Sequence, residues 1–337
     1  MNPKSPFSNR RKTKNGFFWR FYRNNNFRIT PKHVFPNLYL KKIVLNLIVN
    51  KKLQSTFQLL RFHFSFFLMP VYWFALSQVK NINWFNAILI FFILHLLVYP
   101  ASNGYNSYMD RDTSSVGGIK NPKVPTKQLF YFTVVMDIIA VALSVIISYI
   151  FAIGIFFYIL ASRAYSYRKI RLKKYPVIGY LTVIIFQGAV TFFLVYHGSS
   201  GNHSFGIHVL PMVASALLIG GFYPLTQIYQ HEEDRKDGVT SLSYLLGYKG
   251  TFIFTGIVYA FAFIVLGWYF YLQIMFLDFI VLQIFMLPVI VYFFIWFKKV
   301  MKNNDEANFK NTMRMNILAS ACSNLGFITL LILKMFE

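Results

Sequence analysis

Long apolar runs recur along most of the chain, and they constrain its fold more than any other feature. A transmembrane helix needs about 20 mostly apolar residues. Nine segments approach or exceed that length: residues 57–79, 83–101, 128–148, 150–167, 176–197, 205–225, 251–271, 273–297 and 311–335. The runs are continuously apolar and lack the alternation of barrel strands. The sequence therefore predicts an all-α membrane protein, a bundle of about nine transmembrane helices.

The charge is strongly positive, but its placement argues against nucleic acid as a partner. The formal net charge is +23, while hydrophobic residues make up 56% of the chain, which is a membrane composition. Residues 1–55 hold 13 Lys and Arg and no acid. No apolar segment with a cleavage site follows them, so they do not resemble a signal peptide. We expect residues 1–55 to form a basic cytoplasmic extension, partly disordered or interfacial, on the anionic leaflet, and residues 56–337 to form the transmembrane domain.

The remaining basic residues alternate between the predicted loops as the positive-inside rule requires. With a cytoplasmic amino terminus, the inner loops contain Arg111, Lys120, Lys123, Lys127, Arg168, Lys169, Arg171, Lys173, Lys174, Arg235, Lys236, Lys249, Lys298, Lys299, Lys302 and Lys310. The outer loops contain only Lys80 and, near the end, Lys334. This pattern predicts a multi-pass protein of the inner (plasma) membrane.

Acidic residues are scarce, and most of them fall in two of these inner loops. Of 11 acids, two follow the second predicted helix and four follow the sixth: Asp110, Asp112, Glu232, Glu233, Asp234 and Asp237. If the first segment is helical, Asn103, Asn106 or Ser107, Asp110 and Ser114 share one face. Gln227, Gln230 and Asp234 repeat that spacing in the second. Oxygen-bearing faces of this kind suit Mg²⁺ and a diphosphate at a cytoplasm-facing central cavity. Ordinary polar loops that solvate helix ends are the alternative.

The two segments together resemble the motifs of the UbiA family of intramembrane prenyltransferases. Asn106-Ser-Tyr-Met-Asp110-Arg-Asp112-Thr-Ser114 is similar to the family's first motif, NDxxDxxxD. Gln227-Ile-Tyr-Gln230-His-Glu232-Glu-Asp234-Arg235 is similar to its second, DxxDxxxD followed by Arg. The segment AYSYRKIRLKKYPVIGYL and the stretch GVTSLSYLLG also resemble family segments. The resemblance covers about residues 56–337.

The resemblance implies Mg-dependent transfer of an isoprenyl group from an allylic diphosphate to a lipophilic acceptor, often an electron-rich aromatic ring. It also implies a metal set that consists of Asn106, Asp110, Ser114, Gln227, Gln230 and Asp234. Asp110 and Asp234 are the catalytic carboxylates in this scheme. The sequence departs from the family pattern because Ser107, Ser114, Gln227 and Gln230 stand where acids are usual. Neutral oxygens bind a dication less tightly than carboxylates, so weaker or fewer magnesium sites are expected.

Five basic residues are candidates for diphosphate binding: Arg61, Lys120, Lys123, Arg171 and Lys174. Lys120 and Lys123 follow the first motif, where the family has a basic residue. Arg61 stands at the inner end of the first predicted helix, where simple snorkelling to the interface is the alternative. Arg171 and Lys174 lie in the middle inner loop, where positive-inside topology alone would also place charge.

Two other functions stay open. A transporter or channel would need polar residues between helices, yet we expect no charged residue deep in a span and find no obvious inverted repeat. A catalytically reduced member of the family, acting as a binding or scaffold partner, is the stronger alternative because motif acids are missing. The sequence does not identify the acceptor, the prenyl chain length or the oligomeric state.

Overall fold

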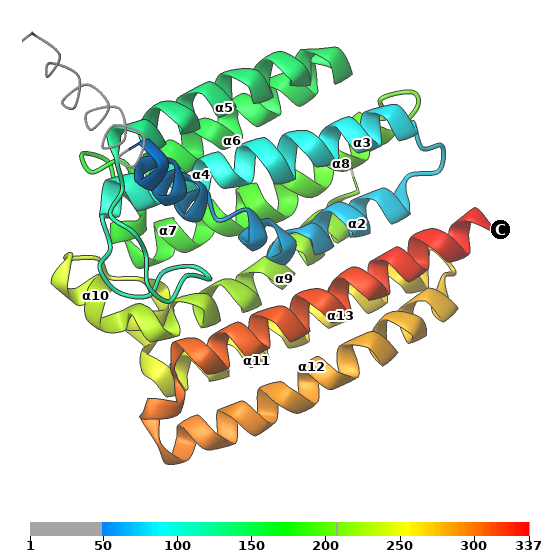
Figure 1. Cartoon of the computed structure of the whole chain (residues 1–337). Helices are drawn as coiled ribbons and strands as arrows, with labels where there is room; N and C mark the ends of the chain where they lie inside the picture. Colours follow the sequence, from blue (N-terminus) through cyan, green and yellow to red (C-terminus); the bar gives the residue numbers. More distant parts are fainter. Residues whose placement is uncertain (1–48, 207, 337) are drawn as a thin grey trace, which may run out of the picture. The chain divides into compact units, whose positions relative to one another are not determined.

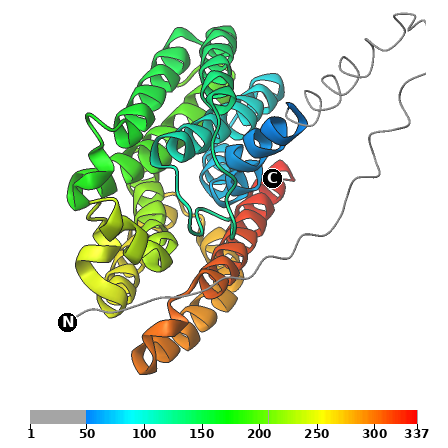
Figure 2. The same cartoon turned by 60° about the vertical axis from the view of Figure 1, so that its left-hand side comes forward.

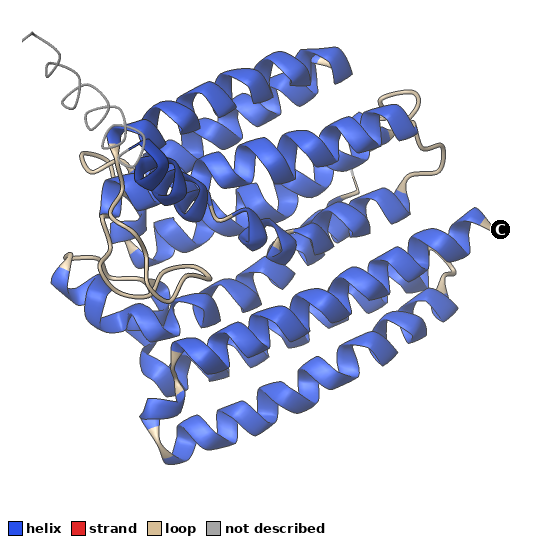
Figure 3. Cartoon of the chain, in the orientation of Figure 1, coloured by secondary structure: helices blue, strands red, loops and turns tan. Residues whose placement is uncertain are grey.

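The computed structural model describes residues 49–206 and 208–336. The predicted basic extension lies outside the described residues except for its last seven positions, which belong to a helix over residues 49–60. Figure 3 shows helices joined by loops, and the described residues contain no strand. The predicted all-α fold is confirmed.

Eight helical segments of the described chain are long and apolar enough to cross a membrane. They are Trp84–Asp110, Lys127–Ile147, Tyr149–Ser166, Pro176–Ser199, Val209–Lys236, Leu242–Leu272, Phe276–Lys302 and Phe309–Met335. A ninth span arises if Val49–Phe67 and Met69–Gln78 (α2), which meet at a bend of 43°, count as one. The predicted bundle of about nine transmembrane helices is therefore confirmed.

The bend in the first span has a local cause. Arg61 adopts a left-handed conformation with φ of 50°, and the 3₁₀ helix η1 (Phe62–Phe67) follows it. Pro70 lies in the first turn of α2, where the missing N–H of proline leaves no intrahelical bond unmade. The chain therefore changes direction between Arg61 and Pro70, and this places Arg61 inside the bundle, where its side chain is buried.

Two spans contain a π-helical segment in their middle. The second span consists of α3 (Trp84–Phe92), the π-helical η2 (Ile93–Val98) and α4 (Tyr99–Asp110). The fifth consists of α7 (Pro176–Val183), the π-helical η4 (Ile184–Val190) and α8 (Thr191–Ser199). Widened turns of this kind shift the register of the side chains that follow.

The second and sixth spans are longer than the apolar runs predicted. We expected the second to end near residue 101, but α4 continues to Asp110. The sixth continues beyond α9 (Val209–Gln227) through the 3₁₀ helix η5 (Ile228–Gln230) into α10 (His231–Lys236). Both extensions are rich in polar residues, so hydropathy alone does not reveal them.

The remaining spans contain no π-helical segment. α5 (Lys127–Ile147) and α6 (Tyr149–Ser166) are separated at Ser148, whose hydroxyl accepts a hydrogen bond from the Phe151 N–H and caps α6. α11 (Leu242–Leu272) bends at Gly247, whose φ of 68° favours glycine. α12 (Phe276–Lys302) and α13 (Phe309–Met335) are joined by a short loop that contains the 3₁₀ turn η6 (Asn304–Glu306).

The helices differ in how deeply they are buried. In the most apolar stretch of the second span, 61% of the residues are buried. In the corresponding stretches of α5 and α12, the shares are 28% and 22%. α5 and α12 therefore expose apolar side chains such as Ile138 and Ile284 around the bundle, as expected of helices that face lipid. In Figures 1 and 2, α10 and the loop that follows α4 gather at one end of the bundle.

One expectation about charge within the spans is wrong. Asp137 lies in the middle of α5, and it forms an ion pair with Arg163 of α6. The Arg163 guanidinium also lies 3.9 Å from the ring centroid of Tyr105 on α4. A charged residue inside a span is tolerated when it is paired and shielded in this way, and the pair joins three helices.

Candidate functional site

A cavity of about 180 Å³ brings the two acidic segments together. Seven of the predicted site residues line it: Arg61, Asn106, Asp110, Ser114, Gln227, Gln230 and Asp234. They come from the first, second and sixth spans and from the loop after α4. Residues that are more than 100 positions apart in the sequence, such as Asp110 and Asp234, thus border the same space. We refer to this space below as the polar cavity.

The first segment reaches the polar cavity by a different route from the continuous helix that we considered. α4 ends at Asp110, and Arg111 adopts a left-handed φ of 57°. Ser114 is therefore outside the helix, so the predicted four-residue face is wrong at its last member. The turn also places Asp112 on the cavity wall. A helix would have pointed Asp112 away from the face of Asp110.

The loop after α4 is held against the bundle by its own apolar residues. Val116 and Ile119 are 5% and 7% exposed, and they exchange two backbone hydrogen bonds. Gly117 lies between them with φ of 20°, and a Cβ at this position would be only 2.1 Å from an Arg61 guanidinium nitrogen. A side chain at position 117 would therefore crowd the Arg61 guanidinium over which the loop packs, and the positive φ also favours glycine.

The second segment is a helix interrupted by the 3₁₀ turn of η5. Gln227 ends α9, Gln230 ends η5, and Asp234 lies in α10. The Ser241 hydroxyl donates a hydrogen bond of 2.8 Å to Asp234. Glu233 lines the polar cavity, whereas Glu232 is exposed and does not.

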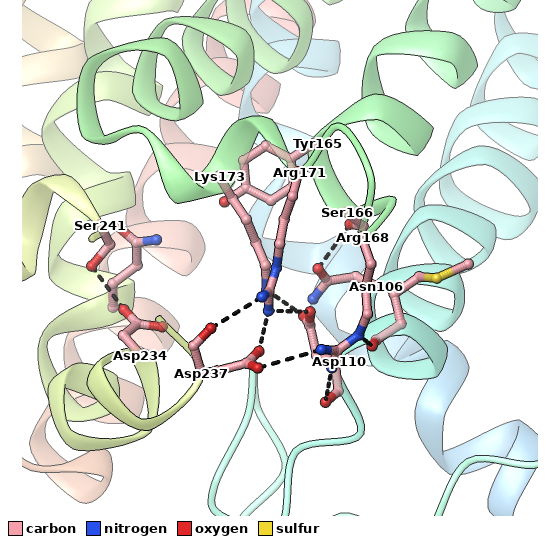
Figure 4. A network of polar contacts seen from close by, with 12 residues as sticks. Asn106, Asp110, Tyr165, Ser166, Arg168, Arg171, Lys173, Asp234, Asp237 and Ser241 are labelled. Carbon is pink, nitrogen blue, oxygen red and sulfur yellow. Dashed lines mark hydrogen bonds and ion pairs between the residues drawn. The ribbon is translucent and has the colours of Figure 1, made fainter. Parts of the chain in front are cut away.

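A short basic segment between α6 and α7 bridges the two acidic segments. Lys173 donates to Asp110 at 2.5 Å, and Arg171 lies 3.5 Å from the same carboxylate. Arg171 also forms an ion pair with Asp237, beyond the end of α10. Figure 4 shows Lys173 and Arg171 extending between Asp110 and the residues of the second segment. Both motif segments are thus connected through cations of the loop between α6 and α7.

Arg168, at the start of the same loop, also contacts both acidic segments. Its guanidinium donates to the backbone carbonyls of Met109 and Asp110, at 2.6 and 3.1 Å. It also lies 3.5 Å from Asp237. The end of α4 and the end of α10 therefore share contacts with a single arginine (Figure 4).

The predicted basic residues divide into two groups. Arg61 is 4% exposed and donates to the Asn103 carbonyl at 2.9 Å, so its guanidinium does not snorkel to solvent. Arg171 is buried beside Asp110. By contrast, Lys120, Lys123 and Lys174 are exposed and line neither cavity.

Several residues of the site were not among the candidates. The sequence gives no reason to separate three of them, Lys173, Arg168 and Asp237, from other loop charges. The fold brings Lys173 and Arg168 to Asp110 and pairs Asp237 with Arg168 and Arg171. Tyr165 and Tyr223 also line the polar cavity, with their hydroxyl groups in contact. Tyr165 lies in the segment AYSYRKIRLKKYPVIGYL, which resembles a family segment, but neither tyrosine was among the predicted site residues.

Burial at the polar cavity disfavours a negative charge that has no nearby cation. Burial and, to a lesser extent, the nearby Asp110 carboxylate raise the pKa of Asp112 to about 6, although Lys173 and Arg61 act in the opposite direction. A further cation placed beside Asp112 would therefore stabilise its ionised form.

The oxygen ligands at the polar cavity fit a hard divalent cation. No group of three His, Cys, Asp or Glu side chains is close enough to hold a metal among the described residues. Mg²⁺, however, is commonly bound by one or two carboxylates together with substrate phosphates and water. Asp110 and Asp234 supply two carboxylates, and the Gln227 Oε1 atom is buried on the cavity wall without a hydrogen-bond partner.

A second cavity of about 280 Å³ adjoins the polar cavity, and its lining is almost entirely apolar. The two share Phe67, Ile219 and Phe222. The second is otherwise lined by side chains such as Tyr259, Met286 and Phe293 from α11 and α12. We call it the apolar chamber. A molecule with a charged head and a hydrocarbon tail would match the polarity of the two spaces.

Comparison with known proteins agrees with this geometry. A model of the UbiA prenyltransferase family matches residues 67–318. No curated protein matches the chain. Among solved structures, an apo UbiA homolog from Aeropyrum pernix K1 is 19% identical, with a TM-score of 0.61 over 80% of this chain and 98% of that one. A UbiA homolog from Archaeoglobus fulgidus bound to DMAPP and Mg²⁺ is 16% identical, with a TM-score of 0.59 over 82% and 99%. A structure of digeranylgeranylglyceryl phosphate synthase is 19% identical, with a TM-score of 0.56 over 84% and 99%.

Proposed function

Because the chain belongs to the UbiA prenyltransferase family, we propose that it transfers an isoprenyl group from an allylic diphosphate to a lipophilic acceptor within the membrane. One observation carries the proposal. Asp110 and Asp234, from two distant segments, border a single polar cavity that adjoins an apolar chamber. The diphosphate would occupy the polar cavity and the isoprenyl tail the apolar chamber. The homolog structure with bound DMAPP and Mg²⁺ supports this class of donor.

The proposed reaction breaks one bond and forms another. The allylic carbon–oxygen bond of the donor ionises, and its electron pair leaves with the diphosphate. The remaining allylic cation is attacked by an electron-rich carbon of the acceptor, which then loses a proton. Prenylated acceptor, diphosphate and a proton are the products, so no oxidant or reductant is needed.

This chain's cations would stabilise the leaving group. Lys173 and Arg171 already lie beside Asp110. A bound diphosphate would compete for these cations and place negative charge where they can neutralise it. The hydroxyl groups of Tyr165 and Tyr223 lie on the same wall and could donate to a phosphate oxygen.

Magnesium would be held by Asp110, Asp234 and the Gln227 side-chain oxygen, with Asn106, Ser114 and Gln230 nearby on the cavity wall. When bound, the ion supplies positive charge that stabilises the departing diphosphate. Fewer carboxylates than the family motifs usually contain predict a lower affinity for the ion than a site with a full set.

The apolar setting suits a cationic intermediate. Aromatic side chains such as Phe67, Phe222 and Tyr158 border the polar cavity, and their ring faces can stabilise a carbocation. Exclusion of water by these side chains would also limit hydrolysis of the cation. We further propose that the protein lies in the inner (plasma) membrane with this site on the cytoplasmic side, because the inner loops hold the basic residues.

A catalytically reduced family member that serves as a binding partner is the second candidate. It is favoured by the pairing of Asp110 with two cations, which leaves this carboxylate already neutralised. The two functions predict different results with purified protein in lipid nanodiscs. A radiolabelled panel of allylic diphosphates, supplied with aromatic acceptors and Mg²⁺, should yield a prenylated product if the protein is an enzyme. Absence of product across the panel, together with retained binding of the diphosphates, would favour the reduced member.

A further inference from the structure

The loop after α4 is fastened to the first helix of the described chain. The Gln58 amide nitrogen donates to the Asn121 carbonyl at 3.3 Å, and the Gln58 amide oxygen accepts from the Lys123 N–H at 2.9 Å. The Ser55 hydroxyl donates to the Val124 carbonyl at 2.7 Å. A spacing of three places Ser55 and Gln58 on one face of the helix. This face therefore holds the loop by its backbone.

An earlier part of the same loop forms a wall of the polar cavity. Asp112, Val116 and Gly117 line that space, and Val116 is only 5% exposed. The fastened part follows closely in the chain, so contacts that steady it also steady the wall. The loop thus connects the polar cavity to the surface of the first helix.

The two fastened elements carry unneutralised positive charge. Their exposed lysines, which we call the lysine surface, are Lys51, Lys52, Lys120, Lys123 and Lys127. Positions 49–60 and 113–136 hold no acid. Within the part of the chain that the structure describes, none of the five lysines forms an ion pair. The Lys123 Nζ donates to the neutral side chain of Gln54 at 3.2 Å, so its charge is not cancelled there.

Exposed apolar side chains lie next to these lysines. Val124 is 79% exposed, and Val49 is 45% exposed. The helix begins the first span, so its start lies near one face of the membrane. In Figure 1 this helix, drawn in blue, lies at the end of the bundle that carries α10. Lysines with apolar neighbours suit the boundary between lipid headgroups and acyl chains.

We propose that the lysine surface binds the headgroups of anionic phospholipids and that this binding holds the loop over the polar cavity. Each lysine near an anionic leaflet adds to the attraction. Because both the helix and the loop contribute lysines, the leaflet attracts the two elements together and opposes their separation. The proposal concerns lipid and does not depend on prenyl transfer.

Positive-inside topology is the alternative explanation, and a second group of lysines separates the two. Lys298, Lys299 and Lys302 are exposed at the end of α12. Asp305 and Glu306 follow them directly, so part of their charge is offset. Topology alone explains both groups equally well. Headgroup binding is expected to be stronger at the lysine surface, where no acid offsets the charge.

The first test measures which lipid gathers at the lysine surface. Cys322 is the only cysteine, so Val124→Cys in a Cys322→Ser background takes a single fluorophore. The protein is placed in phosphatidylcholine nanodiscs with a trace of lipid that carries a quencher on one acyl chain. The labelled lipid is either phosphatidylglycerol or phosphatidylcholine, so only the headgroup differs. We expect association of phosphatidylglycerol to be stronger by about fivefold or more, the ratio that one lysine near an anionic surface provides.

Variants assign this preference to residues. The triple variant Lys51→Gln, Lys123→Gln and Lys127→Gln should lose most of it. The same replacement of the three lysines of α12 is the matched control and should keep it. Inorganic pyrophosphate, at the concentration of the labelled lipid, should leave the preference unchanged. Equal association of the two lipids, an unchanged preference in the first triple variant, or displacement of the lipid by pyrophosphate would each overturn the lipid site.

The second test asks whether the lipid holds the loop. Val116→Cys in the Cys322→Ser background places a thiol at a buried position of the loop. Its reaction with N-ethylmaleimide, which is uncharged, reports how often the loop lifts. The rate should be roughly threefold or more lower in nanodiscs that contain phosphatidylglycerol than in phosphatidylcholine alone, because the anionic leaflet stabilises the covered state. This comparison needs no further variant. Equal rates in the two kinds of nanodisc would overturn the effect on the loop.

Two glutamine variants of the same helix locate the connection. Gln58→Leu removes both bonds to the loop backbone, so the thiol should react faster and the effect of the lipid should shrink. Gln54→Leu is the control, because Gln54 is exposed and contacts the Lys123 side chain rather than the loop backbone. It should leave the rates nearly unchanged. Equal behaviour of the two variants would contradict the role of Gln58.

Discussion

Lys173 Nζ lies 2.5 Å from the Asp110 carboxylate, whose side chain is only 2% exposed. The one acid that remains at a motif position in the first segment is thus neutralised by a cation of the protein. If the proposed function is correct, a divalent ion would compete with Lys173 for the same oxygens. A bound diphosphate would give Lys173 a second anion to pair with and would leave the Asp110 oxygens free for the ion. Binding of the metal and binding of the donor would therefore be linked through Lys173.

Replacing Lys173 should affect the metal and the donor in opposite directions. In Lys173→Met, Asp110 loses its nearest cation, so Mn²⁺ should bind the substrate-free protein more tightly, by roughly three- to tenfold. Affinity for inorganic pyrophosphate without metal should fall. Electron paramagnetic resonance of Mn²⁺ and pyrophosphate binding give the two values. Lys174→Met is the control, because Lys174 is exposed. Weaker Mn²⁺ binding in Lys173→Met would contradict the competition.

The bridge between the acidic segments should contribute to stability. Arg171 is 10% exposed and pairs with both Asp110 and Asp237. Asp237→Asn removes the charge that holds the loop between α6 and α7 to the second segment. We expect a loss of about 1–3 kcal/mol in the free energy of unfolding, the range for charge-assisted hydrogen bonds. Unfolding of the detergent-solubilised protein measures the loss. In an Arg171→Gln background, Asp237→Asn should have a smaller effect, because only the contact with the half-exposed Arg168 remains to be lost.

Stability should depend on pH through Asp112. Burial raises its pKa from 3.8 in the unfolded chain to about 6 in the folded protein. The unfolded chain therefore ionises first, and this group lowers the stability of the fold as pH rises from about 4 to above 6. Asp112→Asn resembles the protonated form. Its apparent melting temperature should equal that of the wild type near pH 4 and exceed it at pH 7.5. An equal difference at both pH values would show that titration of Asp112 is not the cause.

Removing one partner of the ion pair between α5 and α6 should destabilise the protein. Asp137 and Arg163 connect α5 to α6, and Arg163 also contacts the Tyr105 ring. Asp137→Leu leaves the guanidinium without a counterion in an apolar environment, and we expect a cost of about 3–5 kcal/mol. The double replacement Asp137→Leu with Arg163→Leu should be closer to the wild type in thermal stability. A double variant that is less stable than Asp137→Leu would contradict this account.

The apolar runs predict the helical bundle well, because the requirement to satisfy backbone groups in lipid leaves few alternatives. They do not predict where α4 and α10 end. Hydropathy falls at the polar residues after position 101, whereas the helix continues to Asp110 because those residues face the interior. The sequence also gave no reason to suspect the partner of Asp137, since pairing between spans depends on how the helices pack.

The candidate site was predictable where side-chain chemistry is specific. Asn106, Asp110, Gln227 and Asp234 were expected to share a site, and they line one cavity. Of two neighbouring loop lysines, we selected Lys174 as the candidate, but the turn after Arg171 directs Lys173 to Asp110 and leaves Lys174 exposed.

The most direct test of the central claim is the rate of Mg²⁺-dependent prenyl transfer in single carboxylate variants. With a donor and acceptor that the wild type uses, Asp110→Ala and Asp234→Ala should each lower kcat/KM by at least about 100-fold, because each removes a charged ligand from the site of leaving-group departure. Asp305→Ala, which removes an exposed acid that lines neither cavity, should leave the rate unchanged. Transfer at the wild-type rate in both Asp110→Ala and Asp234→Ala would contradict the account.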